Sequence, residues 1–354
     1  MLSIGLMGAS LKLLGHGFAE NLVKSVSNPF AGLLIGILAT SIIQSSSATS
    51  SLVVGLIGGL SMAGAHAGGD ACAITTLTIQ NAIPIIMGAN IGTSVTNTLV
   101  SLGHITHKVE FRRAFAAAIV HDTFNIIAVA IFLPLQLATN FLGVAATHVA
   151  SAFSRAGCLK FASPIKMLTK PVIDLIQNSP LGIGWLDILI ALALLFFSLN
   201  MLVRTLKSIV LKKVEVFFDT YIFKTVLRAL IFGMILTVLV QSSSITTSLV
   251  IPLAGAGILT LRQIFPYTLG ANVGTTVTAF LAALAIGCPE SITIALVHVL
   301  FNIFGIMVIW PIRRIPLGFA HWFSGLAVNN RVMPILFVAF VFFLLPLALI
   351  FITR

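Results

Sequence analysis

Long segments without a single charged residue are the feature that most constrains this chain. Asp, Glu, Lys and Arg are absent from residues 25–69, 71–107, 123–154, 229–261, 263–289, 291–312 and 332–353. A helix needs about 20 apolar residues to cross a bilayer, so each segment is long enough for one crossing and some are long enough for a helical hairpin. The sequence does not show the alternating strands, each about ten residues long, of an outer-membrane barrel. It therefore predicts an all-α polytopic membrane protein.

Composition argues against several other classes. Only 8 % of the 354 residues are charged, against about a quarter in soluble domains, which argues against a soluble enzyme or a disordered protein. The formal net charge is +11, but the basic residues lie in short clusters between apolar runs and not in the dense stripe of a nucleic-acid binder. We therefore expect the lipid bilayer, and no nucleic acid, as a partner, and a multi-pass protein of the cell (inner) membrane. Residues 1–25 lack a basic start and a cleavage site, so we expect a first membrane helix there and not a signal peptide.

Three motifs occur twice in the same order, which indicates a duplicated unit. Gln-Ser-Ser-Ser stands at 44–47 and 241–244, Gly-Ala-Asn-x-Gly-Thr at 88–93 and 270–275, and a segment that begins with His and ends in Phe-Asn at 121–125 and 298–302. The chain is therefore expected to divide into repeat 1 (1–140), an inter-repeat linker (141–182), repeat 2 (183–312) and a C-terminal part (313–354) with an amphipathic segment and a final helix.

The charges near equivalent loops indicate that the two repeats are inverted. Repeat 1 has Lys108, Arg112 and Arg113 after its Gly-Ala-Asn segment, whereas the matching connection of repeat 2, residues 287–290, has no Lys or Arg. Short loops rich in Lys and Arg stay in the cytoplasm. Equivalent loops are thus expected on opposite sides of the membrane, as in the inverted-topology repeats of secondary transporters. The basic residues of the linker do not follow this scheme, because the scheme places the linker outside.

Gln-Ser-Ser-Ser lies between two apolar stretches in both repeats, so it predicts a helix break at membrane depth. Such a break is tolerated only where it is buried in protein or lines a cavity. It exposes helix-end N–H groups, which favour an anion, and C=O groups, which favour a cation. Ser hydroxyls and the Gln amide add hydrogen bonds without permanent charge. We expect such a site to hold a tetrahedral oxyanion and Na⁺ together.

The Gly-Ala-Asn-x-Gly-Thr segments are expected to form a second break in each repeat. Their glycines permit unusual backbone angles and close approach, and Asn and Thr supply oxygens for a hard cation. Small residues in membrane helices are also common packing contacts, and Ser can hydrogen-bond to its own helix. The pairing of both motifs in two copies favours a substrate site over packing alone.

The motif pattern resembles the type II sodium-dependent phosphate cotransporter family. The resemblance rests on both Gln-Ser-Ser-Ser segments, on residues 84–100 and 111–125, and more weakly on 161–177 and 198–203. It implies Na⁺-driven uptake of inorganic phosphate by alternating access, on an inverted-repeat fold with re-entrant, broken helical hairpins. Without the long cytoplasmic tails and the long external loop of animal members, the chain looks like a minimal bacterial member. The family implies no cofactor, and Na⁺ is the co-transported ion.

The family pattern, carried over position by position, implies the site residues. Phosphate is expected to bind Gln44, Ser45, Ser46, Ser47, Gln241, Ser242, Ser243 and Ser244. Na⁺ is expected to bind Gln44, Ser45, Asn90, Thr93, Gln241, Ser242, Asn272 and Thr275. No residue is assigned a catalytic role.

His121 and Asp122 suggest an acid–base pair, but adjacent helix residues face different directions. We expect a packing hydrogen bond for His121. For Asp122 we expect a place near a helix end and an ion pair with Arg112 or Arg113, although acids inside membranes are functional by default. Asp70 is expected to be a loop carboxylate.

Two other functions remain open, namely a Na⁺-independent anion channel or facilitator and an intramembrane serine hydrolase. A hydrolase needs a serine activated by a base, and an oxyanion hole. No Gly-x-Ser-x-Gly surrounds either serine cluster, and twin clusters are unexpected for a single nucleophile. We therefore do not expect an enzyme.

Overall fold

The computed structural model describes residues 28–66, 71–155, 190 and 222–353. Over these ranges the chain forms helices and turns and contains no strand, which confirms the all-α prediction. The described helical segments that are long and apolar enough to cross a membrane are Ile79–Leu102, Lys108–Thr139, Leu261–Ile286, Pro289–Ile309 and Met333–Ile352. The expected N-terminal helix, Asp70 and most of the linker lie outside the described residues.

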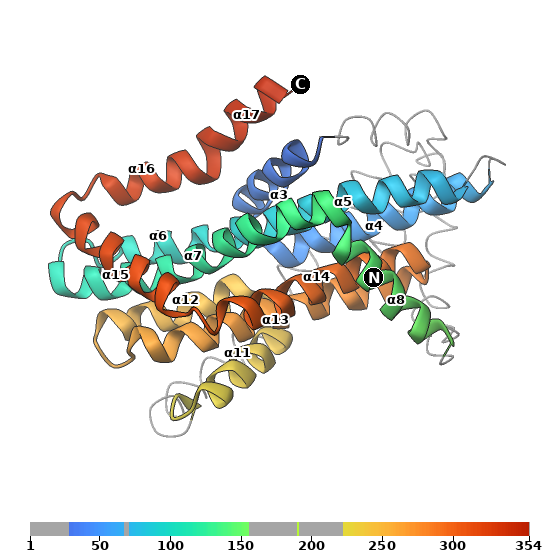
Figure 1. Ribbon diagram of the computed structural model, residues 1–354. Coiled ribbons are helices and arrows are strands. Elements are labelled where there is room, and N and C mark those ends of the chain that lie inside the picture. The colour runs from blue at the N-terminus through green and yellow to red at the C-terminus, as the bar shows by residue number, and fades with distance from the viewer. Residues whose placement is uncertain (1–27, 67–70, 156–189, 191–221, 354) are drawn as a thin grey trace.

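The described part before residue 156 forms the helices α3 (Pro29–Ile43), α4 (Ser46–His66), α5 (Ala71–Thr93), α6 (Val95–Leu102), α7 (Lys108–Thr139) and α8 (Phe141–Arg155) (Figure 1). Local signals begin α3, because the Asn28 side chain accepts a hydrogen bond from the N–H of Phe30 (2.9 Å) and Pro29 stands where an N–H would have no partner. Only Ser94 separates α5 from α6, and its backbone stays in the right-handed helical region. The two helices therefore continue one another.

The described part after residue 221 forms α11 (Val226–Val240), α12 (Ser243–Gly255), α13 (Leu261–Ile286), α14 (Pro289–Ile309), α15 (Arg314–Asn329), α16 (Met333–Ala339), the π-helical turn η3 (Phe340–Leu344) and α17 (Leu345–Thr353). Thr225 caps α11 by accepting from the N–H of Arg228 (3.3 Å). Gly287 ends α13 at a φ of 69°, a conformation that a residue with a side chain rarely adopts.

Each Gln-Ser-Ser-Ser segment forms the turn of a helical hairpin. The first helix of the hairpin runs parallel to the helix that carries the Gly-Ala-Asn motif, and the second helix returns beside it (Figure 1). The contacts that show the parallel direction are Leu33 with Gly88, Ile37 with Gly92, Leu230 with Gly270 and Met234 with Gly274.

The Gly-Ala-Asn-x-Gly-Thr segments lie inside continuous helices, so the expectation of a second break was wrong. Residues 88–93 form the last turns of α5, and residues 270–275 lie in the middle of α13. None of their glycines has a positive φ. A Cβ on Gly88 or Gly270 would overlap the carbonyl oxygen of Leu33 or Leu230. These glycines therefore bring two helix backbones into contact and do not bend the chain.

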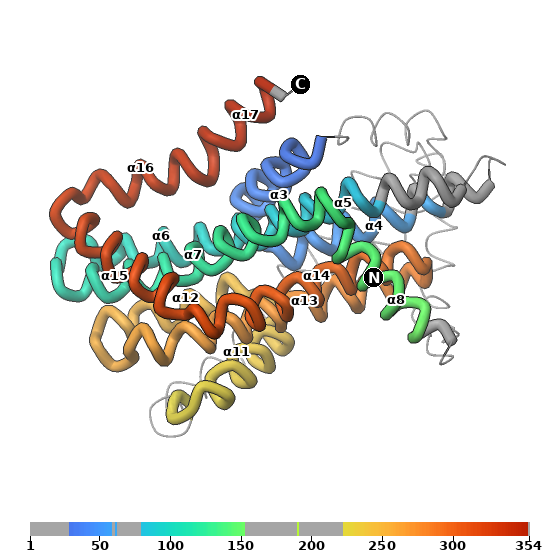
Figure 2. The backbone as a smooth tube through the Cα atoms, in the orientation of Figure 1, coloured from blue at the N-terminus to red at the C-terminus, as the bar shows by residue number. Residues whose placement is uncertain are grey.

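The hairpin of each repeat packs against the other repeat. In one hairpin, Gly58 of α4 lies against Ser291 of α14, whose hydroxyl donates to the carbonyl of Val54 (3.1 Å). In the other, Gly255 of α12 lies against His104 in the turn between α6 and α7. Figure 2 shows that the α6–α7 turn and the equivalent α13–α14 turn lie at opposite ends of the bundle.

The C-terminal segment covers the outside of the bundle. After α15 the chain turns back, so that α16 lies beside α6, and η3 and α17 lie beside α3 (Figure 2). In the most apolar 18-residue stretch of Met333–Ile352, only 17 % is buried in the protein. Large side chains such as Leu336 and Phe351 are exposed. A surface of this kind suits contact with lipid tails, which are as apolar as the side chains themselves.

Candidate substrate site

Both Gln-Ser-Ser-Ser segments break the helix in the same way. α3 ends at Gln44 (φ 58°) and α11 ends at Gln241 (φ 55°), both in the left-handed region. The two Gln N–H groups donate to the carbonyls of Thr40 and Thr237, each at 2.7 Å. This conformation is uncommon for residues other than Gly, and it reverses the chain within two residues. The helix break predicted at each motif is therefore confirmed.

The Gln side chains bridge the two parallel helices of each unit. The amide N–H donates to a carbonyl in the last turn of the first helix, and the amide oxygen accepts from a Thr hydroxyl beyond the Gly-Ala-Asn motif. The partners are Ser41 (2.5 Å) and Thr96 (2.6 Å) for Gln44, and Val238 (2.6 Å) and Thr278 (2.6 Å) for Gln241. Each amide keeps a second N–H and a second oxygen lone pair for an ion.

The serines begin the second helix of each hairpin. The hydroxyl oxygen of Ser45 accepts from the N–H of Ala48 (3.2 Å), and that of Ser242 accepts from the N–H of Ile245 (3.4 Å). The other N–H groups of a first helical turn have no partner within the helix. The Ser47 hydroxyl is buried and has no hydrogen-bond partner within the part of the chain that the structure describes. The junctions therefore offer donors that suit an anion.

The two junctions meet inside the bundle. The hydroxyl of Ser244 lies 3.4 Å from the carbonyl oxygen of Gln44 and 3.5 Å from that of Thr93. Ser46, Ser47 and the serines 242–244 are all buried. The structure thus brings together the two motifs that are about 200 positions apart in the sequence.

The Asn residues of the Gly-Ala-Asn motifs bind His residues of the opposite repeat. His121 Nε2 lies 2.7 Å from Oδ1 of Asn272, and His298 Nε2 lies 3.3 Å from Oδ1 of Asn90. Asn272 also donates to Oδ1 of Asn125 (2.8 Å). The expected packing hydrogen bond of His121 is confirmed, and it has a counterpart in the second repeat.

The four predicted sodium ligands of the Gly-Ala-Asn motifs do not all lie at the junctions. Thr93 contacts Ser244 through its carbonyl oxygen. The Thr93 and Thr275 hydroxyls donate to carbonyls of their own helices, at 2.9 and 3.0 Å. Among the described residues, no hydrogen bond joins Asn272 or Thr275 to a Gln-Ser-Ser-Ser residue. Asn272 instead belongs to the His–Asn network, through His121 and Asn125.

Asp122 lies far from the arginines that were expected to bind it, so that expectation was wrong. It lies in the middle of α7, with 1 % of its surface exposed, and its Oδ2 accepts from the hydroxyl of Thr98 (3.0 Å). Arg112 and Arg113 are exposed at the start of the same helix. The rise of a helix puts Arg112 about 15 Å away along the axis.

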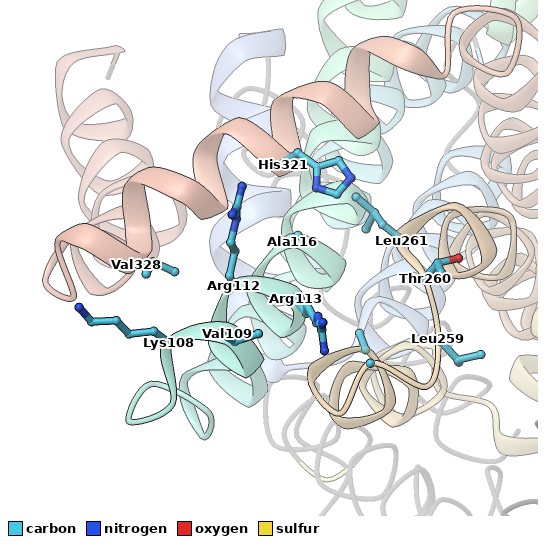
Figure 3. A pocket seen from close by; sticks show the side chains of 12 residues that line it. Lys108, Val109, Arg112, Arg113, Ala116, Leu259, Thr260, Leu261, His321 and Val328 are labelled. Carbon is cyan, nitrogen blue, oxygen red and sulfur yellow. The ribbon is translucent and has the colours of Figure 1, made fainter.

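A basic cavity of about 650 Å³ opens at the start of α7. Lys108, Arg112 and Arg113 reach it from α7 and His321 reaches it from α15, while the turn before α13 closes the other side (Figure 3). The guanidinium of Arg113 lies against Gly257, so that it occupies the place where a Cβ would stand, and the φ of 79° at Gly257 is one that residues with a side chain rarely adopt. None of the described residues that line the cavity is acidic. Its positive potential attracts anions to this end of the bundle.

Several residues of this polar core were not predicted from the sequence. They are Thr96, Asn97, Thr98, Asn125 and Thr278. Thr96 and Thr278 stand at the same position relative to the two Gly-Ala-Asn segments, and Asn125 ends the repeated His-to-Asn segment. The internal repeat could therefore have indicated these three residues. Asn97 and Thr98 have no polar counterpart in repeat 2, and no sequence signal pointed to them.

Known proteins are similar in sequence to this chain over most of its length. Residues 1–69 and 194–345 match the family model described as Na⁺/Pi-cotransporter. Sodium-dependent phosphate transport protein 2B of Homo sapiens is 30 % identical over 448 aligned positions, which cover 98 % of this chain and 62 % of that protein. Sodium-dependent phosphate transport protein 2A of Rattus norvegicus is 33 % identical over 425 positions, which cover 97 % of this chain and 64 % of that protein. The chain thus spans less than two thirds of the length of these relatives. No solved structure matches it significantly.

Proposed function

Because this chain belongs to the Na⁺/Pi-cotransporter family, we propose that it is a secondary transporter that couples Na⁺ entry to the uptake of inorganic phosphate. The observation that carries the proposal is the meeting of two uncharged, oxygen-rich junctions inside the bundle, at Ser244 and Gln44. Relatives that are named sodium-dependent phosphate transport proteins support it. Its place is the cell (inner) membrane of a bacterium.

The junctions provide opposite partial charges side by side. The helix beginnings at Ser46 and Ser243 direct N–H groups at phosphate, and the buried hydroxyls of these serines complete its hydrogen-bond shell. The helix ends at Gln44 and Gln241 direct carbonyl oxygens at Na⁺. Bound Na⁺ lowers the repulsion that phosphate meets in a low-dielectric interior, so each ion favours binding of the other.

Transport requires that the loaded site open to the two sides in turn. We propose that the repeats are inverted and that one repeat assembly moves against the other, as in transporters with discontinuous helices. Support comes from the equivalent turns at opposite ends of the bundle. The 15-residue helices α3 and α11 are only about 22 Å long by the rise of a helix. A full crossing needs about 30 Å, so both hairpins are re-entrant.

The geometry favours a transporter over a serine hydrolase. A hydrolase would need a base within hydrogen-bond reach of a serine hydroxyl. His121 is engaged on both ring nitrogens by Asn97 (3.0 Å) and Asn272 (2.7 Å). His298 faces Asn90. Among the described residues, no hydrogen bond joins either imidazole to a serine of the two junctions.

Phosphate uptake into proteoliposomes tests the proposal. We expect the purified protein to accumulate radioactive phosphate when an inward Na⁺ gradient is imposed, and to take up only background amounts when choline replaces Na⁺. Arsenate, which is also a tetrahedral oxyanion, should compete. Equal uptake in Na⁺ and choline would instead indicate a channel or facilitator, and no uptake with release of a hydrolysis product would indicate an enzyme.

Cysteine labelling tests the inverted arrangement. In a variant without the native cysteines, we expect R112C to be labelled by an impermeant maleimide only after the cells are opened, and E290C to be labelled on intact cells. Cys288→Ser should be tolerated, because residue 288 is the N-cap of α14 and serine is a favourable N-cap residue. Burial raises the pKa of the Cys288 thiol and makes it a poor nucleophile. Labelling of both introduced cysteines from the same side would contradict the arrangement.

A further inference from the structure

The basic cavity at the start of α7 is not part of the proposed substrate site. Its cationic side chains on α7 are Lys108, Arg112 and Arg113 (Figure 3). Among the described residues no carboxylate forms an ion pair with them, and Glu110 on the same turn lies 3.3 Å from His104 instead. A guanidinium group carries five N–H donors in a planar fork that matches the geometry of a phosphate group. The cavity therefore offers donors and positive charge that the described fold does not use.

The cavity is built from elements that are far apart in the chain. α7 and α15 form two of its sides, and the α12–α13 turn closes it. The guanidinium of Arg113 stands where Gly257 of this turn would carry a Cβ, and a guanidinium nitrogen of Arg112 lies 4.0 Å from the equivalent place on Gly325 of α15. Each guanidinium is therefore seated next to a glycine of another element. Such a convergent arrangement is more specific than the general excess of Lys and Arg on the cytoplasmic side.

The size and the lining of the cavity favour a ligand larger than inorganic phosphate. Its volume of about 650 Å³ lies in the range of pockets that hold ligands of drug size. Most of its other lining residues are apolar, namely Val109, Ala116, Ala254, Leu259, Leu261 and Val328. A free phosphate ion gains nothing from an apolar wall. A phosphate ester with an apolar part can use both the cations and this wall.

The cavity lies at the polar edge of the membrane-spanning helices. Arg113 is the last Lys or Arg of α7, and the residues that follow it, 114–125, are all buried. Arg262 is the one charged residue of α13, and it stands at the start of this helix. The last charges before a long apolar span mark the level of the lipid head groups. Basic pockets between membrane helices at this level bind anionic head groups.

An exposed apolar stripe of α15 lies next to the cavity-lining residue His321. The stripe consists of Ile315, Phe319, Trp322 and Leu326, which are all exposed. They recur every three or four residues, so they share one face of the helix. Aromatic side chains are enriched at the interface between membrane and water. The stripe therefore provides a surface for acyl chains beside a cavity that suits a phosphate group.

We propose that the basic cavity binds the head group of an anionic phospholipid. Its phosphate lies between Arg112 and Arg113, with the ammonium of Lys108 and the imidazole of His321 as further donors, and its acyl chains follow the α15 stripe. Because α7 belongs to repeat 1, the turn before α13 to repeat 2 and α15 to the C-terminal part, the bound lipid links three parts of the chain. This inference goes beyond the proposed function, because it does not depend on which ion the protein carries.

Lipid binding to the purified protein in a nonionic detergent tests the site. We expect native mass spectrometry to show one phosphatidylglycerol molecule bound to the wild type, with a higher affinity than phosphatidylcholine. The attraction of one Lys or Arg to an anionic lipid corresponds to roughly fivefold in affinity. Arg112→Gln and Arg113→Gln should therefore each weaken phosphatidylglycerol binding about fivefold, and the double variant about thirtyfold. Unchanged affinity in the double variant would overturn the site.

Arg262→Gln is the matched control. Arg262 is exposed and follows the lining residue Leu261 in the chain, but it does not line the cavity itself. This substitution changes the net charge by the same amount as Arg112→Gln, at the same end of the bundle, and should leave phosphatidylglycerol binding as in the wild type. A loss as large as that in Arg112→Gln would show that diffuse positive charge attracts the lipid, and it would contradict a defined site.

Inorganic phosphate shares the anionic phosphate group with the lipid, so a second measurement separates the two sources. We expect millimolar inorganic phosphate to leave the bound phosphatidylglycerol in place, and the double variant to bind inorganic phosphate like the wild type in calorimetry with Na⁺. If phosphate displaced the lipid and the double variant lost a phosphate site, the cavity would hold the free ion and the lipid proposal would be wrong. Lipid binding is measured without transport, so a failure of Na⁺-driven uptake would refute the proposed function and leave this site standing.

Discussion

Gln44→Ala and Gln241→Ala are each expected to abolish Na⁺-coupled phosphate transport while the protein remains folded in detergent. Each change removes an amide that bridges the hairpin turn to a Thr hydroxyl at 2.6 Å. A buried polar group that loses its partner costs about 1–3 kcal/mol, or roughly 5- to 150-fold in binding. Because both ions share the junction, coupled transport should suffer more than the binding of either ion alone. Calorimetry of phosphate binding with and without Na⁺ measures the effect.

Gln263→Ala is the control for these two variants. Gln263 accepts a hydrogen bond from the N–H of Thr260 (2.9 Å) at the start of α13, away from the junctions. Its loss should leave phosphate binding unchanged. If the motifs only packed helices, both junction variants would be mild, and Ser46→Ala and Ser243→Ala would be nearly silent. Wild-type, Na⁺-enhanced phosphate binding in both Gln variants would move the substrate site away from the junctions.

Gly88→Ala and Gly270→Ala are expected to lower the stability of the folded protein strongly. The added methyl group would overlap the carbonyl oxygen of Leu33 in α3 or of Leu230 in α11. Backbone atoms cannot rotate away as a side chain can, so the paired helices must separate. Overpacking of this kind costs about 1–3 kcal/mol and occasionally more. The measurement is thermal unfolding of the purified protein in detergent.

Gly318→Ala is the matched control for the two glycine variants. Gly318 lies in α15, and a Cβ there meets nothing within 4 Å. Alanine is a better helix former than glycine by about 1 kcal/mol, so this variant should be as stable as the wild type or slightly more stable. If Gly88→Ala and Gly270→Ala unfolded at the same temperature as Gly318→Ala, the close helix contacts inferred for α3 with α5 and α11 with α13 would be wrong.

Local patterns were enough to predict the class of fold and the turns that carry the serines. A charge-free run long enough to cross a bilayer leaves few structures other than a helix, because every backbone group must find its partner within the chain. The helix breaks at Gln44 and Gln241 were predicted because a polar motif between two apolar stretches can persist there only as a break. The internal repeat also pointed to Asn90 and Asn272. In the structure each of them contacts a His residue of the opposite repeat.

The glycine motifs show where a local pattern is ambiguous. Glycine permits both an unusual backbone angle and a close approach of two chains. The sequence of residues 88–93 and 270–275 does not distinguish the two uses, because the second depends on a helix that lies elsewhere in the chain. The parallel packing of α3 on α5, and of α11 on α13, decided in favour of close approach.

Contacts between distant segments were decided by the tertiary structure alone. The sequence by itself determined a duplicated, helical membrane protein with two broken helices, because hydrophobic length and motif order are properties of the chain. It placed Asp122 beside arginines of its own helix, whereas packing of α6 on α7 provides Thr98 as its partner. Packing of the two repeats likewise joins His121 to Asn272, 151 positions apart, and Ser244 to Gln44, 200 positions apart. Such partners follow from how helices fill space around each other, which no periodicity along one segment contains.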